Sequence, residues 1–144
     1  MPQLRCLIEE LASNSQHRVL LLGIPNAECV RLLAVRLERG LIFGMGPAQK
    51  VAEARRACRE LVNVMFHPGD PTEIPWQDQF FSCAVGVEPS EWESVDGVVA
   101  EVFRVLSPDG LLYMPEPLEI RHPGFVLTGV CEGWRRWQKA GSRG

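Results

Sequence analysis

The feature that most constrains the fold is a fivefold alternation of short apolar runs with segments of helical periodicity. The first run, Arg18 to Gly23, is apolar after its first residue and ends at a glycine. Such a run is typical of a strand buried on both faces of a parallel sheet. The other runs lie at residues 41–43, 62–66, 80–87 and 111–114. Their crossovers are long enough for parallel pairing, so the alternation predicts a doubly wound, mostly parallel α/β sheet with helices on both faces.

Helical spacing fills the segments between these runs. Leu4, Leu7, Ile8 and Leu11 predict a helix within residues 1–12. Ser90 and Glu93 have the spacing of a capping box ahead of an apolar series from Val95 to Leu106. We expect one domain over residues 1–144, with an N-terminal helix at 1–12, a core at 18–117 and a final segment at 118–144.

Composition and charge exclude several classes of protein. The net charge of −3 argues against nucleic acid as a partner, because phosphate binding relies on an excess of Lys and Arg. The five cysteines include no C-x-x-C pair, which predicts no metal site and a reduced, cytoplasmic protein. No apolar run approaches the roughly 18–20 residues that cross a membrane, and residues 1–12 carry Glu9 and Glu10 rather than a signal peptide.

The final segment allows two interpretations. Residues 125–130 could form one strand, or residues 123–139 one helix with Val126, Val130, Trp134 and Trp137 along one side. We favour the helix, which leaves a sheet of about five strands that is shortened at its C-terminal end. The fifth strand would then present an open edge, and we expect a second copy or another protein to cover it. A basic cluster lies beside the tryptophans and is interpreted as a solvated helix end, with nucleic acid or anionic lipid as the alternative; it comprises Arg135, Arg136, Lys139 and Arg143.

Two motifs resemble those of class I S-adenosylmethionine (SAM) methyltransferases of the small-molecule "type 11" group. Residues 101–110, E-V-F-R-V-L-S-P-D-G, are similar to the family's E-x-x-R-V-L-x-P-G-G, and residues 69–81 are similar to its G-D-A-x-x-L-P-F-x-D-x-x-F loop. Each precedes an apolar run, as in the family, and the resemblance covers residues 18–117. It implies a Rossmann-like fold, SAM as cofactor and a small-molecule methyl acceptor.

The resemblance also implies site residues. Asp70, with Pro71 beside it, matches the acidic residue that binds the adenine amino group, and Gly23 matches the first glycine of the cofactor turn. Ala27 replaces the third glycine, a mild change, and three further positions depart from the family. Leu21 replaces an acidic residue and Pro25 replaces the second glycine; matching on the proline of the next helix puts Gly44 where the ribose carboxylate belongs.

No catalytic residue is identified by the sequence. His67, Glu88 and Glu116 are candidates because each lies near the carboxyl end of a predicted strand. Two functions therefore stay open. One is a SAM-dependent methyltransferase acting on a small molecule, with weak or lost activity. The other is a non-catalytic module of the same fold that binds a protein or a ligand other than SAM. A different nucleotide-binding domain is disfavoured, because neither G-x-G-x-x-G nor a P-loop occurs.

Overall fold

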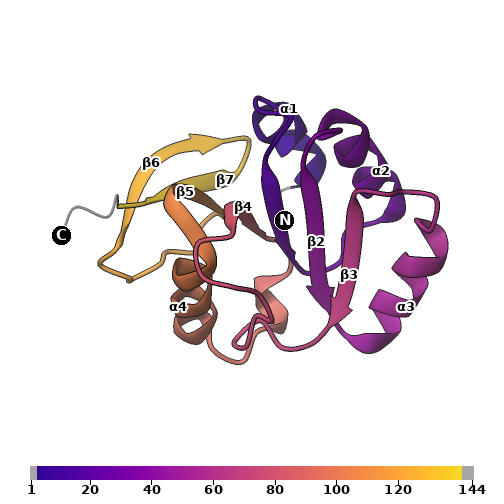
Figure 1. The fold of residues 1–144 in the computed structure, drawn as a ribbon. Coiled ribbons are helices and arrows are strands. Elements are labelled where there is room, and N and C mark those ends of the chain that lie inside the picture. Colours follow the sequence, from indigo (N-terminus) through magenta and orange to yellow (C-terminus); the bar gives the residue numbers. More distant parts are fainter. Residues whose placement is uncertain (1–2, 141–144) are drawn as a thin grey trace.

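The computed structural model describes residues 3–140 and contains one seven-stranded mixed sheet. The strand order is β3-β2-β1-β4-β5-β7-β6, with the first five parallel and β7 antiparallel to both of its neighbours (Figure 1). The strands are β1 Arg18–Leu22, β2 Leu41–Gly46, β3 Val64–Pro68, β4 Phe81–Gly86, β5 Leu106–Pro115, β6 Phe125–Cys131 and β7 Trp134–Lys139.

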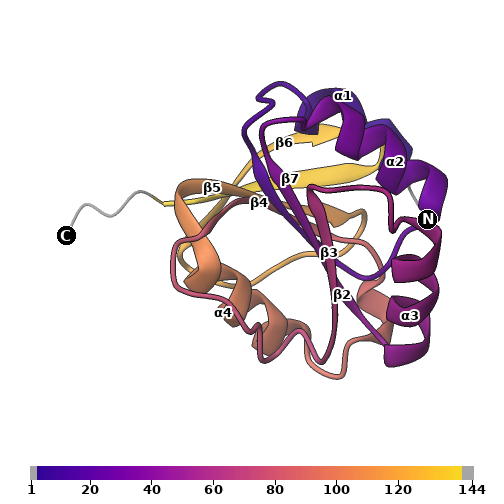
Figure 2. The same ribbon diagram turned by 45° about the vertical axis from the view of Figure 1, so that its right-hand side comes forward.

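Helices cover both faces of the sheet, with α1, α2 and α3 on one side and α4 on the other (Figure 2). The expected N-terminal helix is present as a 3-10 turn followed by α1; residues 1 and 2 lie outside the described residues. The helical segments are η1 Leu4–Leu7, α1 Ile8–Leu11, α2 Ala27–Arg36, α3 Ala48–Ala57, η2 Pro89–Glu91 and α4 Val95–Val105. The predicted α/β fold with a parallel core is confirmed.

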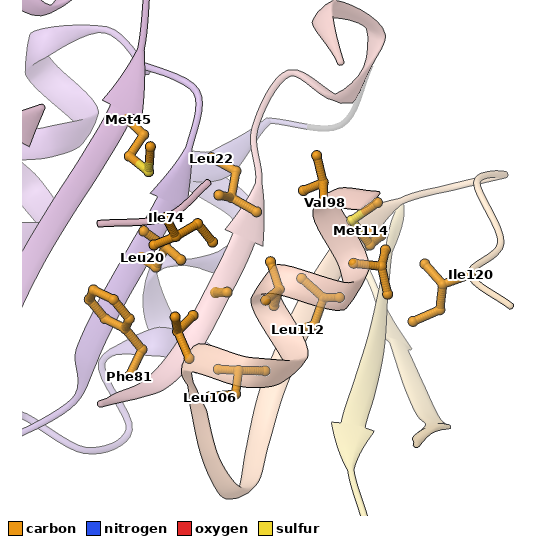
Figure 3. Packing of buried hydrophobic residues seen from close by; sticks show 14 of the residues in the cluster. Leu20, Leu22, Met45, Ile74, Phe81, Val98, Leu106, Leu112, Met114 and Ile120 are labelled. Atoms are coloured by element: carbon orange, nitrogen blue, oxygen red, sulfur yellow. The ribbon is translucent and has the colours of Figure 1, made fainter. Parts of the chain in front are cut away.

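The core divides along the two faces of the sheet. Under α4, alternate residues of the central strands meet the buried valines of that helix, as Figure 3 shows around Leu20, Leu112 and Val98. On the opposite face, Leu21 and Tyr113 pack with η1, α1 and α2. The central strands β1, β2 and β4 are thus buried on both sides, which explains their continuous apolar runs, whereas β3 at the sheet edge buries only Phe66.

The expected C-terminal helix is wrong, since residues 125–139 form the antiparallel hairpin β6–β7. Its turn consists of Glu132 and Gly133, both with positive φ (51° and 89°), as in the two-residue turns that match strand twist. The sheet has seven strands, not about five. The expected open edge is also wrong, because β7 pairs with β5 from Leu111 to Pro115, so no partner is needed there.

The basic cluster is engaged within the molecule. Arg135 pairs with Glu116 and Glu119, and Arg136 pairs with Glu10. Lys139 is buried against the end of α4. Arg143 lies outside the described residues. The three described cations therefore form no free patch for nucleic acid or lipid. Separately, none of the helices within residues 3–140 is long and apolar enough to cross a membrane.

Candidate functional site

A cleft of about 510 Å³ lies at the carboxyl edge of the parallel strands. β1 pairs with β2 on one side and with β4 on the other, so the strand order reverses beside β1. In doubly wound sheets ligands bind at this switch point, and the volume lies within the usual range of about 300–1,000 Å³ for small-molecule sites. The lining is Gly23, Met45, Gly46, Pro47, Ala48, Pro68, Gly69, Asp70, Pro71, Glu88, Glu91, Trp92 and Glu93.

Gly23 forms the floor of the cleft at the end of β1. Its φ of +126° is a conformation that side chains rarely adopt, and a Cβ there would lie 3.0 Å from both the Glu88 nitrogen and the Val87 Cβ. Its amide donates to the Met45 carbonyl oxygen at 2.8 Å, which ties the turn to β2. Backbone can therefore approach a ligand closely at this point.

At the end of β2, Gly46 lines the cleft, whereas the predicted Gly44 does not. Gly44 does not line the cleft; a Cβ there would lie 3.0 Å from the Phe66 ring and 3.4 Å from Ile24, among packed side chains. Gly46 lines the cleft, and its Cβ would lie 2.8 Å from Ile24 Cγ1. Neither glycine supplies a carboxylate at this end of β2.

Asp70 and Pro71 both lie where the resemblance puts them, in the loop after β3 on the wall of the cleft. One carboxylate oxygen of Asp70, Oδ1, accepts from the Thr72 amide and hydroxyl, each at 2.9 Å. These hydrogen bonds from Thr72 lower the pKa of Asp70. Gly69 donates its amide to the Gly46 carbonyl oxygen at 3.2 Å, so the loop is fixed to β2.

Glu88 enters the cleft from the other side, after β4. Its amide donates to the Leu22 carbonyl oxygen at 3.2 Å, and its carboxylate accepts from Lys50 Nζ at 3.0 Å. That hydrogen bond raises the pKa of Lys50. Glu91 and Glu93 follow on the same side, so four carboxylates line a cleft that contains no Lys or Arg side chain among the described residues.

The other two catalytic candidates lie outside this cleft. Glu116 lines a second hollow of about 560 Å³ beyond β5, separated from the cleft by the short turn η2. There it pairs with Arg135 at 3.7 Å. His67 is exposed on β3, and its ring centroid lies 6.2 Å from that of Phe43. The structure therefore brings Gly23, Asp70, Pro71 and Glu88 together and leaves Gly44, His67 and Glu116 apart.

The other two departures from the family pattern lie away from the cleft. Leu21 is completely buried in the core between the sheet and α1 and α2. Pro25 lines a different hollow, between α2 and α3, and not the cleft. Its neighbour Asn26 caps α2 by accepting from the Cys29 amide at 2.9 Å.

Sequence reasoning missed three residues that line the cleft, Gly46, Trp92 and Glu91, and the partner of Glu91, Lys50. Gly46 lies two residues beyond Gly44, and β2 extends to Gly46, past the apolar run at residues 41–43. Trp92 lies over the end of β4, where a Cβ on Gly86 would be 3.1 Å from its ring. Lys50 and Glu91 give no local signal, because their ion pair joins residues 41 positions apart. No cluster of three or more metal-ligating side chains occurs within residues 3–140.

The fold and the cleft agree with comparisons to known proteins. The model of the family described as "Methyltransferase domain" matches residues 20–114. The chain belongs to this methyltransferase family. Its relative YrhH of Bacillus subtilis (strain 168), named as a candidate methyltransferase, is 26% identical over 112 residues, which are 75% of this chain and 62% of YrhH. The chain thus spans less than two thirds of that relative.

Solved structures show the same methyltransferase fold. SpnF, named as a [4+2]-cyclase, is 26% identical with a TM-score of 0.68 over 78% of this chain and 44% of SpnF. A Methanococcus maripaludis protein, named as a candidate S-adenosyl-L-methionine-dependent methyltransferase, has a TM-score of 0.72 at 13% identity; the match covers 97% of this chain and 86% of that protein. The predicted family is confirmed, and SAM is confirmed as its cofactor.

Proposed function

We propose that this methyltransferase domain binds SAM in the cleft between β1, β2 and β4 and transfers its methyl group to a small molecule. The observation that carries the proposal is that Gly23 and Asp70, far apart in sequence, line one cleft at the switch point of the sheet. When bound, SAM supplies an electrophilic methyl group on its sulfonium sulfur. The chain's own part is to hold and orient the reactants.

The lining fits the nucleoside end of the cofactor. Gly23 lines the cleft with backbone alone, because a Cβ there would collide with Val87 and Glu88, and Asp70 presents a carboxylate whose second oxygen, Oδ2, has no hydrogen bond within the described residues. We assign the adenine amino group to Asp70, with Pro71 beside it. The ribose is held less firmly than in the family, since Gly46 offers it no carboxylate.

The hollow that contains Glu116 is our proposed acceptor site. It adjoins the cleft across η2 and is lined mainly by apolar groups, including Pro115, Pro117 and Leu118. Glu116 is the carboxylate placed at this hollow to accept a proton from an acceptor that must lose one. His67 lies outside both spaces, so we give it no role.

A non-catalytic module is the second candidate. It is favoured by Gly44 and by the buried Leu21, which stand where the family pattern has two carboxylates. SpnF has the same fold and is named as a cyclase. The fold therefore also occurs in a protein named for a reaction other than methyl transfer. A cytoplasmic location remains a prediction; all five cysteines are free in the described residues.

Calorimetric titration with SAM and with S-adenosylhomocysteine tests the proposal. We expect binding that Asp70→Ala weakens at least tenfold, because a hydrogen bond to a charged group contributes about 1.5–3 kcal/mol. Glu73→Ala is the matched control, because Glu73 is exposed on the same loop and does not line the cleft. An absence of heat at millimolar ligand would leave the non-catalytic module.

A further inference from the structure

Lys50 joins the two sides of the cleft. It lies in the first turn of α3, and its Nζ donates to Glu88 Oε1 at 3.0 Å and to Glu91 Oε2 at 3.5 Å. Both acceptors line the cleft, whereas Lys50 lines the neighbouring hollow with Ile24 and Pro25. The Lys50 ammonium group therefore stands at the boundary of the two hollows, next to the turn that follows β1.

The position of Glu88 is fixed beside that turn. The Glu88 amide donates to the Leu22 carbonyl oxygen, and a Cβ on Gly23 would lie 3.0 Å from the Glu88 nitrogen. A cation held by this carboxylate is consequently held next to the glycine that forms the floor of the cleft. Within residues 3–140, Lys50 is the only cation that forms an ion pair with the four carboxylates of the lining.

We propose that Glu88 and Glu91 form a subsite for the α-ammonium group of SAM and that Lys50 Nζ fills this subsite when no ligand is bound. The inference rests on the proposed function. Both groups are primary alkylammonium ions with three N–H donors, so one can replace the other at the same two carboxylates. Lys50 is thereby an internal competitor that lowers the affinity for any ligand with an amino-acid end.

The ion pairs of Lys50 with Glu88 and Glu91 are weak enough for the ammonium group of a ligand to replace Lys50. The side chains of Lys50, Glu88 and Glu91 are 41%, 31% and 42% exposed, and pairs in such positions are screened by solvent. The ammonium group of SAM is tethered to a nucleoside that makes further contacts, which raises its effective concentration at the subsite. Lys50 has a flexible stem and can move into solvent.

Titrations with three nucleosides distinguish binding at the subsite from binding in the rest of the cleft. SAM and S-adenosylhomocysteine carry the amino-acid end, whereas 5′-methylthioadenosine lacks it. Calorimetric titrations of the whole chain would compare the wild type with Lys50→Met, with the double variant Glu88→Gln/Glu91→Gln and with Arg56→Met. Arg56→Met is the matched control, because it removes one exposed positive charge from the same helix. Circular dichroism would confirm that each variant is folded.

We expect Lys50→Met to tighten SAM and S-adenosylhomocysteine binding about threefold or more, with 5′-methylthioadenosine unchanged. The double variant should weaken the first two nucleosides and spare the third. Unchanged affinities in Lys50→Met overturn the subsite, and so does weaker SAM binding, because Lys50 would then bind the ligand carboxylate. If 5′-methylthioadenosine binds without these responses, only this inference fails. If no nucleoside binds any variant, the proposed function fails as well.

Discussion

Arg104 and Glu101, one helical turn apart on α4, form a two-point ion pair that holds the loop carrying Asp70. Arg104 Nε donates to Glu101 Oε1 at 2.7 Å, and its NH2 group donates to Oε2 at 2.9 Å. The same guanidinium donates to the carbonyl oxygens of Ile74 and Trp76, and Glu101 accepts from the Ile74 amide at 2.7 Å. The E-x-x-R motif thus fixes the segment between β3 and β4.

Arg104→Lys should destabilise the fold by about 1–3 kcal/mol, because an ammonium group cannot make the two-point contact and the loop carbonyls together. The free energy of unfolding in urea measures this loss. Arg59→Lys, on an exposed residue after α3, should change it by less than about 0.5 kcal/mol. An Arg104→Lys protein as stable as the wild type would show that the loop is held by its apolar contacts.

The same pair predicts a loss of stability in acid. Arg104 lowers the pKa of Glu101 by hydrogen bonding to it. A carboxyl whose pKa is lowered by folding stabilises the protein above its unfolded pKa, and this contribution disappears as the pH falls through the folded pKa. Glu101→Gln should therefore be less stable than the wild type at pH 7, with the difference shrinking below about pH 4. Urea titrations over this range measure it; a constant difference would contradict the mechanism.

Lys139 should be more important for stability than a lysine near a chain end usually is. Its Nζ donates to the Phe103 and Leu106 carbonyl oxygens at 2.6 and 2.7 Å, at the C-terminus of α4, and lies 4.4 Å from the Phe103 ring centroid. We expect Lys139→Met to cost about 1–3 kcal/mol, because two buried carbonyls lose a charged donor. The urea midpoint measures this; Lys50→Met, with a half-exposed lysine, is the control.

Sequence patterns predicted the parallel core because the central strands are buried on both faces and each helix shows one apolar side. They failed at the C-terminal hairpin. Val126, Val130, Trp134 and Trp137 have helical spacing, but β7 gains its pairing from β5, some twenty residues earlier in the chain. The turn signal was weak, since Glu132 stands where Asn or Asp usually precedes the glycine.

The sequence also did not predict the local structure around the site. The capping box predicted at Ser90 is wrong: α4 begins at Val95, and Ser94 is its cap, accepting from the Gly97 amide at 3.0 Å. Residues 89–91 form the separate turn η2, which places Glu88 and Glu91 on the cleft. A motif match could bring Gly23 and Asp70 into one site, but not the long-range partner Lys50.

Gly46 lines the cleft at the end of β2 and offers a ribose no carboxylate. A Cβ there would lie 2.8 Å from Ile24 Cγ1, so Gly46→Asp alone should destabilise the fold. Ile24→Ala makes room for it. We therefore expect Ile24→Ala/Gly46→Asp to bind SAM about 10–100-fold more tightly than Ile24→Ala, since the new carboxylate accepts from the ribose hydroxyls. Calorimetry with both proteins measures the gain.

Gly44→Asp distinguishes the two glycines. Its Cβ would lie 3.0 Å from the Phe66 ring, which packs against α3, so the carboxylate would enter the packed layer between the sheet and α3 and not the cleft. We expect a loss of stability with no gain in SAM affinity, even when Ile24→Ala is added. If Gly44→Asp raised the SAM affinity as much as Gly46→Asp does, the ribose would lie beside Gly44, as the motif alignment implies. The cofactor would then lie away from the cleft floor at Gly23.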